Sequence, residues 1–173
     1  MNHVITIDLF NRLTGQETLH PQVCLADLSG DELQDDLYMP CNFYALIYQQ
    51  HGVETNALSP TSLRLVNPGE MFEIPSVHHR QTKGYSGVLF HPGLLCDTPL
   101  EQHIGDYPTR CSCRSSLSVH ERQIISDCLQ EIDKELHHAI DRHSSTIIVS
   151  HIELLLNYCT RFCSKQEESL FYL

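Results

Sequence analysis

The chain has 173 residues, a net charge of −11 and a charged fraction of 19%. This length is enough for one domain with a hydrophobic core, with or without a small appendage. Because an acidic surface repels phosphate backbones, we do not expect this chain alone to bind nucleic acid. No apolar run approaches the roughly 18 residues that span a bilayer, and the opening "MNHVITIDLFNRLTG" does not form a secretory signal. We therefore expect a cytoplasmic protein with no membrane partner.

The first two-thirds of the chain has the pattern of short strands separated by turn residues. The runs of strand length are "QVCLADL" (22–28), "NFYALIYQQ" (42–50), "TSLRLV" (61–66), "MFEIP" (71–75) and "YSGVLFH" (85–91). Short strands at roughly ten-residue spacing, with Gly and Pro between them, are typical of a β-sandwich or barrel. The connections leave no room for crossover helices, which excludes a parallel doubly wound sheet.

The pattern becomes helical near residue 115. A turn and a short helix are expected within 91–108, and Ser118 and Glu121 then fit a capping box. The helix that follows is predicted to run to about Ile140, with one apolar stripe made of Ile125, Cys128, Leu129, Ile132, Leu136 and Ile140. After "DRHSS", a second helix is predicted over about 146–165. We therefore predict a small β-barrel sensor region over 1–115 and an antiparallel helical hairpin for dimerisation over 116–173.

Eight cysteines are scattered along the chain, without the paired spacing of a disulfide-stapled domain. In a cytoplasmic protein, most of them are expected to be reduced thiols, several of them buried as small apolar residues. Cys111 with Cys113, and Cys159 with Cys163, each supply at most half of a zinc site, because such a site needs about four ligands.

Four segments, taken in order and spacing, resemble one protein family. They are "GYSGVLFHPGLL" (84–95), "PLEQHIGDY" (99–107), "SVHERQIISDCLQEIDKELHHAIDRHS" (118–144) and "IELLLNYCTRF" (152–162). Together they resemble the N-terminal regulatory region of AraC-type bacterial transcription regulators, and the resemblance extends from "LHPQVCLADL" to Gln166. It implies a cupin-like jelly-roll barrel that senses a small-molecule effector, and helices that mediate homodimerisation. It also implies a following DNA-binding domain with two helix-turn-helix units.

The chain departs from the family pattern after Gln166. Seven residues follow, where family members continue through a basic segment into the DNA-binding half. We therefore interpret the chain as a regulatory and dimerisation domain, with DNA bound only through a domain absent here. It is either an excised or truncated regulator, or a stand-alone module that interacts with full-length relatives. No cofactor is expected.

The main alternative is a metal-dependent cupin enzyme. Catalytic cupins bind a metal through His-x-His, a carboxylate and a later histidine, and the nearest candidates here are His78, His79, Glu70, Glu73 and His91. His78 and His79 are adjacent, so on a strand their side chains point to opposite faces. The "RQTKG" that follows them supplies no carboxylate. We therefore expect no metal and no catalytic residues, and we expect His91, which precedes a proline, to shape a turn.

The inward positions of the barrel are the expected effector site, because small barrels either fill with side chains or enclose one small molecule. Alternation along 42–50 puts Tyr44 and Tyr48 on one face of the strand. It leaves open whether this face or the opposite one (Phe43, Ala45, Ile47) points inward. With their hydroxyl groups, Tyr44 and Tyr48 are the better recognition surface, although an ordinary core explains the same pattern. They are predicted to bind the ligand, together with His78 and His79.

The second predicted helix has more apolar surface than one neighbour covers. At about 100° per residue, one stripe consists of Ile148, Ile152, Leu155, Cys159 and Phe162, widened by Val149 and Leu156. A separate ridge of Ile147, Leu154 and Tyr158 lies roughly 100° away. The apolar arc spans roughly 220°, against the roughly 100° that faces one core. We predict that the stripe packs within the protomer and that the ridge meets a second subunit in a two-fold dimer.

Overall fold

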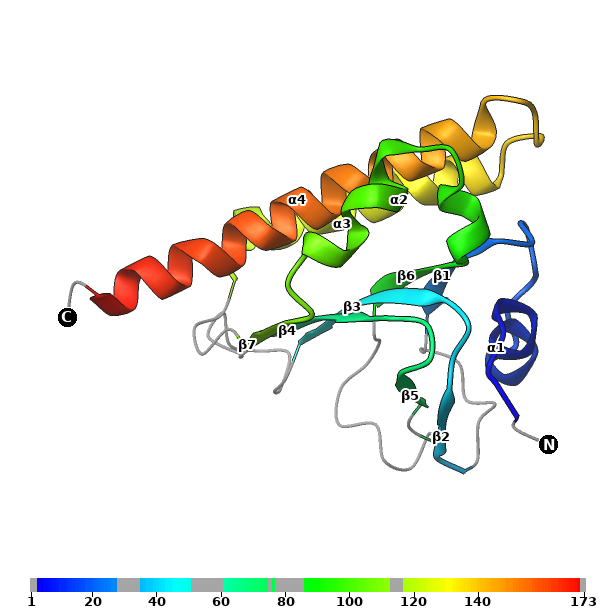
Figure 1. Ribbon diagram of the computed structural model, residues 1–173, viewed down its shortest axis with the longest axis horizontal. Helices are drawn as coiled ribbons and strands as arrows, with labels where there is room; N and C mark the ends of the chain where they lie inside the picture. Colours follow the sequence, from blue (N-terminus) through cyan, green and yellow to red (C-terminus); the bar gives the residue numbers. More distant parts are fainter. Residues whose placement is uncertain are drawn as a thin grey trace.

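The protein folds as antiparallel sheets followed by a pair of long helices. The computed structural model describes residues 3–27, 35–50, 61–74, 76, 86–112 and 117–171. In chain order its elements are α1 (Ile7–Thr14), β1 (Val23–Asp27), β2 (Leu37–Pro40), β3 (Tyr44–Gln50), β4 (Thr61–Val66), β5 (Met71–Ile74), β6 (Ser86–Phe90), the 3₁₀ helix η1 (Pro92–Leu95), α2 (Pro99–His103), the 3₁₀ helix η2 (Ile104–Asp106), β7 (Arg110–Ser112), α3 (Val119–Leu136) and α4 (Ser144–Phe171). α3 and α4 lie side by side on one side of the strands, and β2 and β5 lie on the other (Figure 1).

The larger sheet has five strands in the order β1-β6-β3-β4-β7, and every neighbouring pair is antiparallel. The smaller sheet pairs β2 with β5, also antiparallel. In the centre of the larger sheet, Leu46 of β3 lies opposite Leu65 of β4 and Val88 of β6. A Cβ added at Gly87 of β6 would collide with the Leu46 carbonyl oxygen. Only a residue without a side chain fits at this point of the sheet.

Alternation along β3 divides its side chains between two hydrophobic cores. Leu46 and Val88 belong to the core between the larger sheet and the helices α3 and α4. Ala45 of β3 and Phe43, which directly precedes β3, belong to the core that the larger sheet shares with the smaller sheet and α1. The face that carries the tyrosines of β3 is therefore the helix-facing one. The core under the helices joins side chains from both predicted segments, 1–115 and 116–173, and the division into two parts stays a prediction.

The predicted strands are present, and each ends within two residues of its predicted limits. Three elements were not predicted: α1, β2 and β7. The prediction of a closed barrel is wrong for the described residues, because their strands form two separate sheets. β2 and β5 bond to each other, and β1 and β7 are the outer strands of the larger sheet.

α3 begins with the predicted capping box. The Ser118 hydroxyl accepts the Glu121 backbone N–H at 3.1 Å, and the Glu121 carboxylate accepts the Ser118 N–H at 2.9 Å. Its predicted end is wrong: α3 stops at Leu136, and Ile140 lies in the loop that follows, 61% exposed. In that loop the Asp141 carboxylate accepts the backbone N–H groups of His143 and Ser144, at the start of α4. The loop therefore includes the residue that caps the next helix. α4 is longer than predicted at both ends.

Candidate functional site

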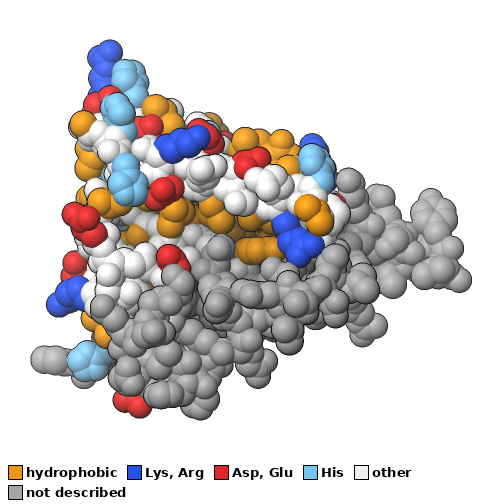
Figure 2. Space-filling view, turned by 180° about the vertical axis from the view of Figure 1, so that it is seen from behind, with side chains coloured by type: hydrophobic (Ala, Val, Ile, Leu, Met, Phe, Trp, Pro, Cys, Tyr) orange, Lys and Arg blue, Asp and Glu red, His pale blue; other side chains and the backbone are white. Residues whose placement is uncertain are grey.

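A groove of about 650 Å³ lies between α3 and the helix-facing side of the larger sheet. It is lined by Leu25 of β1, Tyr48 of β3, and Val119, Arg122, Gln123, Ile125, Ser126, Leu129, Gln130 and Asp133 of α3. In a view from behind, hydrophobic side chains form the floor of a hollow that has basic side-chain surface at one end (Figure 2). The volume lies within the usual range for small-molecule sites, about 300–1,000 Å³.

Helical spacing places the polar groups of this groove. Arg122, Ser126 and Asp133 are separated by four and seven residues, so they lie on one face of α3. The neighbouring face of α3 is the buried stripe made of Ile125, Cys128, Ile132 and Leu136. Burial of this apolar stripe fixes the rotation of α3 about its own axis. That rotation turns the polar stripe toward the groove rather than into the core.

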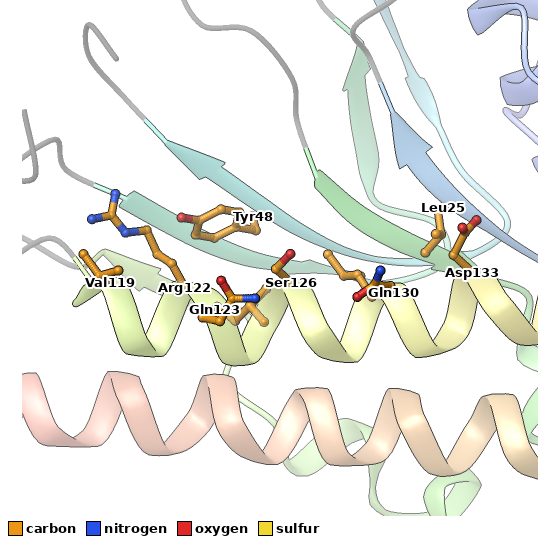
Figure 3. A pocket seen from close by; sticks show the side chains of 10 residues that line it. Leu25, Tyr48, Val119, Arg122, Gln123, Ser126, Gln130 and Asp133 are labelled. Carbon is orange, nitrogen blue, oxygen red and sulfur yellow. The ribbon is translucent and has the colours of Figure 1, made fainter. Parts of the chain in front are cut away.

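Arg122 and Tyr48 form the positively charged end of the groove. The Tyr48 hydroxyl points toward the Arg122 guanidinium (Figure 3). Burial raises the pKa of the Tyr48 phenol, and the Arg122 charge opposes that rise. The hydroxyl is therefore protonated at neutral pH and can donate a hydrogen bond. Among the described residues no carboxylate forms an ion pair with Arg122, so its guanidinium is available to a ligand.

Asp133 lies toward the opposite end of the groove. It is about 16 Å from Arg122 along the helix axis, at about 1.5 Å per residue. The Nδ1 atom of His137 lies 3.5 Å from the Asp133 carboxylate. Between the two charged ends, the half-buried side chains of Leu25 and Leu129 give the groove apolar walls. The groove therefore has a positive end, an apolar middle and a negative end.

Of the residues predicted to bind a ligand, Tyr48 lines the groove and Tyr44 does not. The ring of Tyr44 stacks on Phe90, with ring centroids 5.3 Å apart and planes at 24°. His78 and His79 lie outside the described residues. Ligand binding by these four residues stays a prediction.

His91 shapes a turn, as predicted. Its Nδ1 atom accepts the backbone N–H of Gly93 at 3.0 Å, which caps the start of η1.

The sequence alone did not identify Arg122, Ser126, Gln130 and Asp133 as groove residues. Their signal is a polar stripe at helical spacing, and most helices carry such a stripe on the side that faces solvent. What makes this stripe distinctive is its position beside β1 and β3. That position depends on tertiary packing, which local spacing does not reveal.

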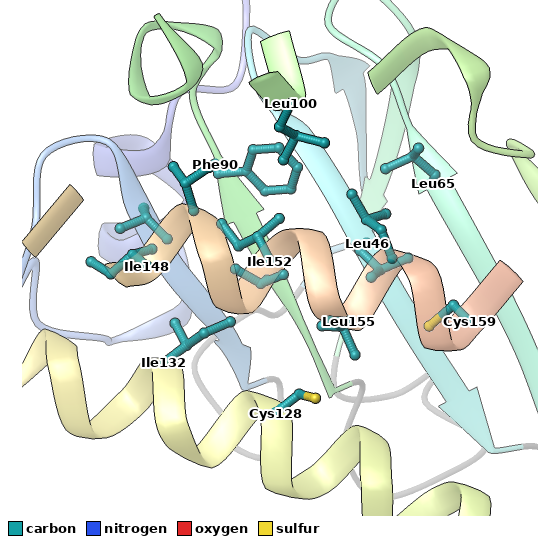
Figure 4. Packing of buried hydrophobic residues seen from close by; sticks show 14 of the residues in the cluster. Leu46, Leu65, Phe90, Leu100, Cys128, Ile132, Ile148, Ile152, Leu155 and Cys159 are labelled. Atoms are coloured by element: carbon teal, nitrogen blue, oxygen red, sulfur yellow. The ribbon is translucent and has the colours of Figure 1, made fainter. Parts of the chain in front are cut away.

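α4 buries the apolar stripe that the sequence predicted to be internal. Its side chains are at most 5% exposed: Ile148, Val149, Ile152, Leu155, Leu156, Cys159 and Phe162. Several of them lie between α4 and its neighbours, with Cys128 and Ile132 of α3 alongside (Figure 4). The prediction that this stripe packs within the protomer is therefore confirmed.

The predicted ridge of α4 lies on a more exposed side of the helix. Ile147 is 38% and Leu154 is 45% exposed. Tyr158 is half-buried and stacks on Phe162, with ring centroids 6.0 Å apart, and the Arg161 guanidinium carbon lies 5.6 Å from the centroid of the Tyr158 ring. The ridge of Ile147, Leu154 and Tyr158 thus presents apolar surface to solvent. Its contact with a second subunit stays a prediction.

The described cysteines form no metal site. Four of them are free thiols: Cys24, Cys41, Cys96 and Cys128. Cys163 is disulfide-bonded, which the sequence did not predict. Disulfides are rare in the reducing cytoplasm, so this one does not support the predicted cytoplasmic location. That location stays a prediction. In the described ranges no three His, Cys, Asp or Glu side chains gather closely enough to hold a metal ion.

Comparison with models of protein families and with curated proteins found no match to this chain. In the part of the chain that the structure describes, no helix has both the length and the apolar content to cross a membrane. The resemblance to AraC-type regulators therefore depends on the four segments that carry it.

Proposed function

We propose that this chain is the effector-sensing and dimerisation domain of an AraC-like bacterial transcription regulator. In this proposal the sheets belong to a cupin-like jelly-roll sensor, and DNA is bound by a helix-turn-helix domain outside this chain. The domain binds a small molecule, pairs with a second copy and has no enzymatic activity of its own. The four resembling segments support the proposal, and so does the arrangement of the groove and the ridge.

One observation carries the proposal: a single pair of helices bears both features. α3 supplies eight of the residues that line the groove, and α4 carries the exposed ridge. The two helices share a core that contains Ile132 of α3 with Ile152 and Leu155 of α4. Packed cores do not deform continuously, so a ligand that shifts α3 must also shift α4. The pair therefore gives a physical route from ligand binding to dimer geometry.

The ridge suits a symmetric contact with a second copy of the chain. Ile147 and Leu154 lie seven residues apart, about two helical turns, so they point to the same side of α4. Closed two-fold dimers are the commonest oligomers, and in them one patch meets its own copy. A glutamate at Leu154 would place an unpaired carboxylate in this contact, which costs several kcal/mol. The dimer should then dissociate while each protomer stays folded.

A reporter assay tests the proposal. The chain is fused to a DNA-binding domain that represses its operator only as a dimer. We expect the fusion to repress, and we expect Leu154→Glu to abolish repression at an unchanged protein level. Ser164→Glu is the matched control, because it adds the same charge at an exposed position of α4, about 80° around the helix from Leu154. It should repress like the unmodified fusion.

Two outcomes of this assay contradict the proposal. One is an unmodified fusion that is folded and abundant but does not repress. The other is full repression by the Leu154→Glu fusion, which would show that dimerisation does not use the ridge.

A further inference from the structure

The groove between α3 and the larger sheet indicates the chemical class of its ligand. We infer that it binds an amphipathic monocarboxylate, a molecule with one carboxylate on an apolar body. This inference rests on the proposed sensing function, because it specifies the effector that the groove would sense.

The positive end of the groove fits a single carboxylate. Arg122 is half-buried, and its guanidinium has no ion-pair partner among the described residues. A guanidinium presents a planar fork of donors that binds the two oxygens of a carboxylate together. The Tyr48 hydroxyl points to the same place and can donate one more hydrogen bond. A neutral ligand leaves the Arg122 charge without its best partner.

The middle of the groove fits an apolar body. Leu25, Ile125 and Leu129 line it. At its edge, Val119 lies one helical turn before Arg122 and is 71% exposed. A ligand body laid along these side chains removes apolar surface from water on both molecules. The ligand therefore extends from the carboxylate toward Leu129 along α3.

The far end of the groove disfavours a second negative charge. The Asp133 carboxylate lies about 16 Å along the helix axis from Arg122, and the described lining contains no cation besides Arg122. An exposed Gln130 lies one turn before Asp133 and offers hydrogen bonds to an uncharged polar group. A ligand with carboxylates at both ends would place the second one in the apolar middle of the groove or, if it is longer, near Asp133. The groove should therefore discriminate against dicarboxylates.

Isothermal titration calorimetry with three eight-carbon probes tests this inference. Octanoate carries one carboxylate, octanamide is its neutral counterpart, and suberate carries a carboxylate at each end. We expect octanoate to bind saturably at one site per protomer. Octanamide should bind about tenfold more weakly or worse, because it loses the hydrogen-bonded charge pair with Arg122. Suberate keeps that pair, but it should also bind more weakly than octanoate, because its second carboxylate would lose hydration in the apolar middle of the groove.

Variants assign the binding to the groove. Arg122→Gln should weaken octanoate binding about tenfold or more, and Tyr48→Phe should weaken it severalfold because it keeps the ring and removes the donor. Arg142→Gln is the matched control: Arg142 is an exposed arginine in the loop between α3 and α4, and its loss should leave the affinity unchanged. Circular dichroism checks that each variant is folded. If a variant does not fold, the comparison of the three probes on the unmodified protein still tests whether the ligand is a monocarboxylate.

Three results would overturn the inference: no saturable octanoate binding, equal affinity for octanoate and octanamide, or unchanged octanoate binding by folded Arg122→Gln. Sedimentation of the same samples separates this inference from the proposed function. A dimer that binds none of the probes overturns the ligand class and leaves the regulatory proposal standing. A monomer that binds octanoate through Arg122 supports the ligand class and contradicts the proposed dimer.

Discussion

Leu154 and Leu155 are neighbours on α4 that differ chiefly in burial, so truncating each to alanine tests how the helix packs. Leu155 is 1% exposed and belongs to the core under the helices, whereas Leu154 is 45% exposed. The change in side-chain chemistry is the same in both variants. The change in intrinsic helix propensity, a few tenths of a kcal/mol, is also the same. Any difference between the two variants therefore reports burial.

The expected difference is large. Leu→Ala in a packed core costs about 2–5 kcal/mol, because contacts are lost and a cavity is left. At Leu154 the cost should stay within about 1 kcal/mol, because solvent fills the space and less apolar area is lost. For a chain of this length about 3 kcal/mol corresponds to about 6–12 °C in Tm. Against a total stability of about 5–15 kcal/mol, the Leu155 variant should be folded but clearly weakened.

Urea unfolding followed by circular dichroism measures both costs. The protein concentration is kept low, so that dissociation of a dimer does not contribute to the midpoint. We expect Leu155→Ala to have a much lower midpoint with an unchanged slope, and Leu154→Ala to unfold near the unmodified protein. The assignment of faces on α4 would be refuted if the two variants had the same urea midpoint, or if the midpoint of Leu154→Ala were lower than that of Leu155→Ala.

Three further predictions concern other parts of the chain. Burial lowers the pKa of His20 from 6.5, so His20 is protonated more readily in the unfolded state and stability should fall as pH drops below about 6.5. Urea midpoints measured between pH 5 and pH 7.5 should fall less for His20→Gln than for the unmodified protein. Burial raises the pKa of Cys24 to about 12 and Cys96 is exposed, so iodoacetamide should alkylate Cys96 in the native protein and Cys24 only in denaturant, as peptide mass spectrometry would show. Ser118→Ala removes the N-cap of α3 and should lower the free energy of unfolding by about 0.5–2 kcal/mol, measured by urea unfolding with Ser126→Ala as an exposed control on the same helix.

The sequence predicted those elements that can be recognised from the pattern of their own residues. The strands β1, β3, β4, β5 and β6 were found because alternation and turn residues mark them. The apolar stripe of α4 was found because its periodicity extends over several turns. The helix α1 also carries a local signal, a Thr6 cap and a left-handed Gly15 at φ 68°, but its β-branched start obscured the helical pattern.

Features that depend on distant pairing were not predictable in the same way. β2 and β7 are four and three residues long and are defined by their partners: Leu37 lies opposite Ile74, and Ser112 opposite Ser62. Whether sheets close into a barrel depends on such pairings, so the strand pattern alone did not exclude an open arrangement. The groove was missed for the same reason. The polar stripe of α3 is local, but its place beside Tyr48 is set by packing of the helix on the sheet.

Sedimentation equilibrium of the unmodified protein and of Leu154→Glu tests the central claim most directly, because it asks whether the ridge of α4 joins two copies of this chain. At tens of micromolar, we expect twice the chain mass for the unmodified protein. For Leu154→Glu we expect the single chain mass, with a circular dichroism spectrum like that of the unmodified protein. A monomeric unmodified protein, a dimeric Leu154→Glu variant or an unfolded one would each contradict the account.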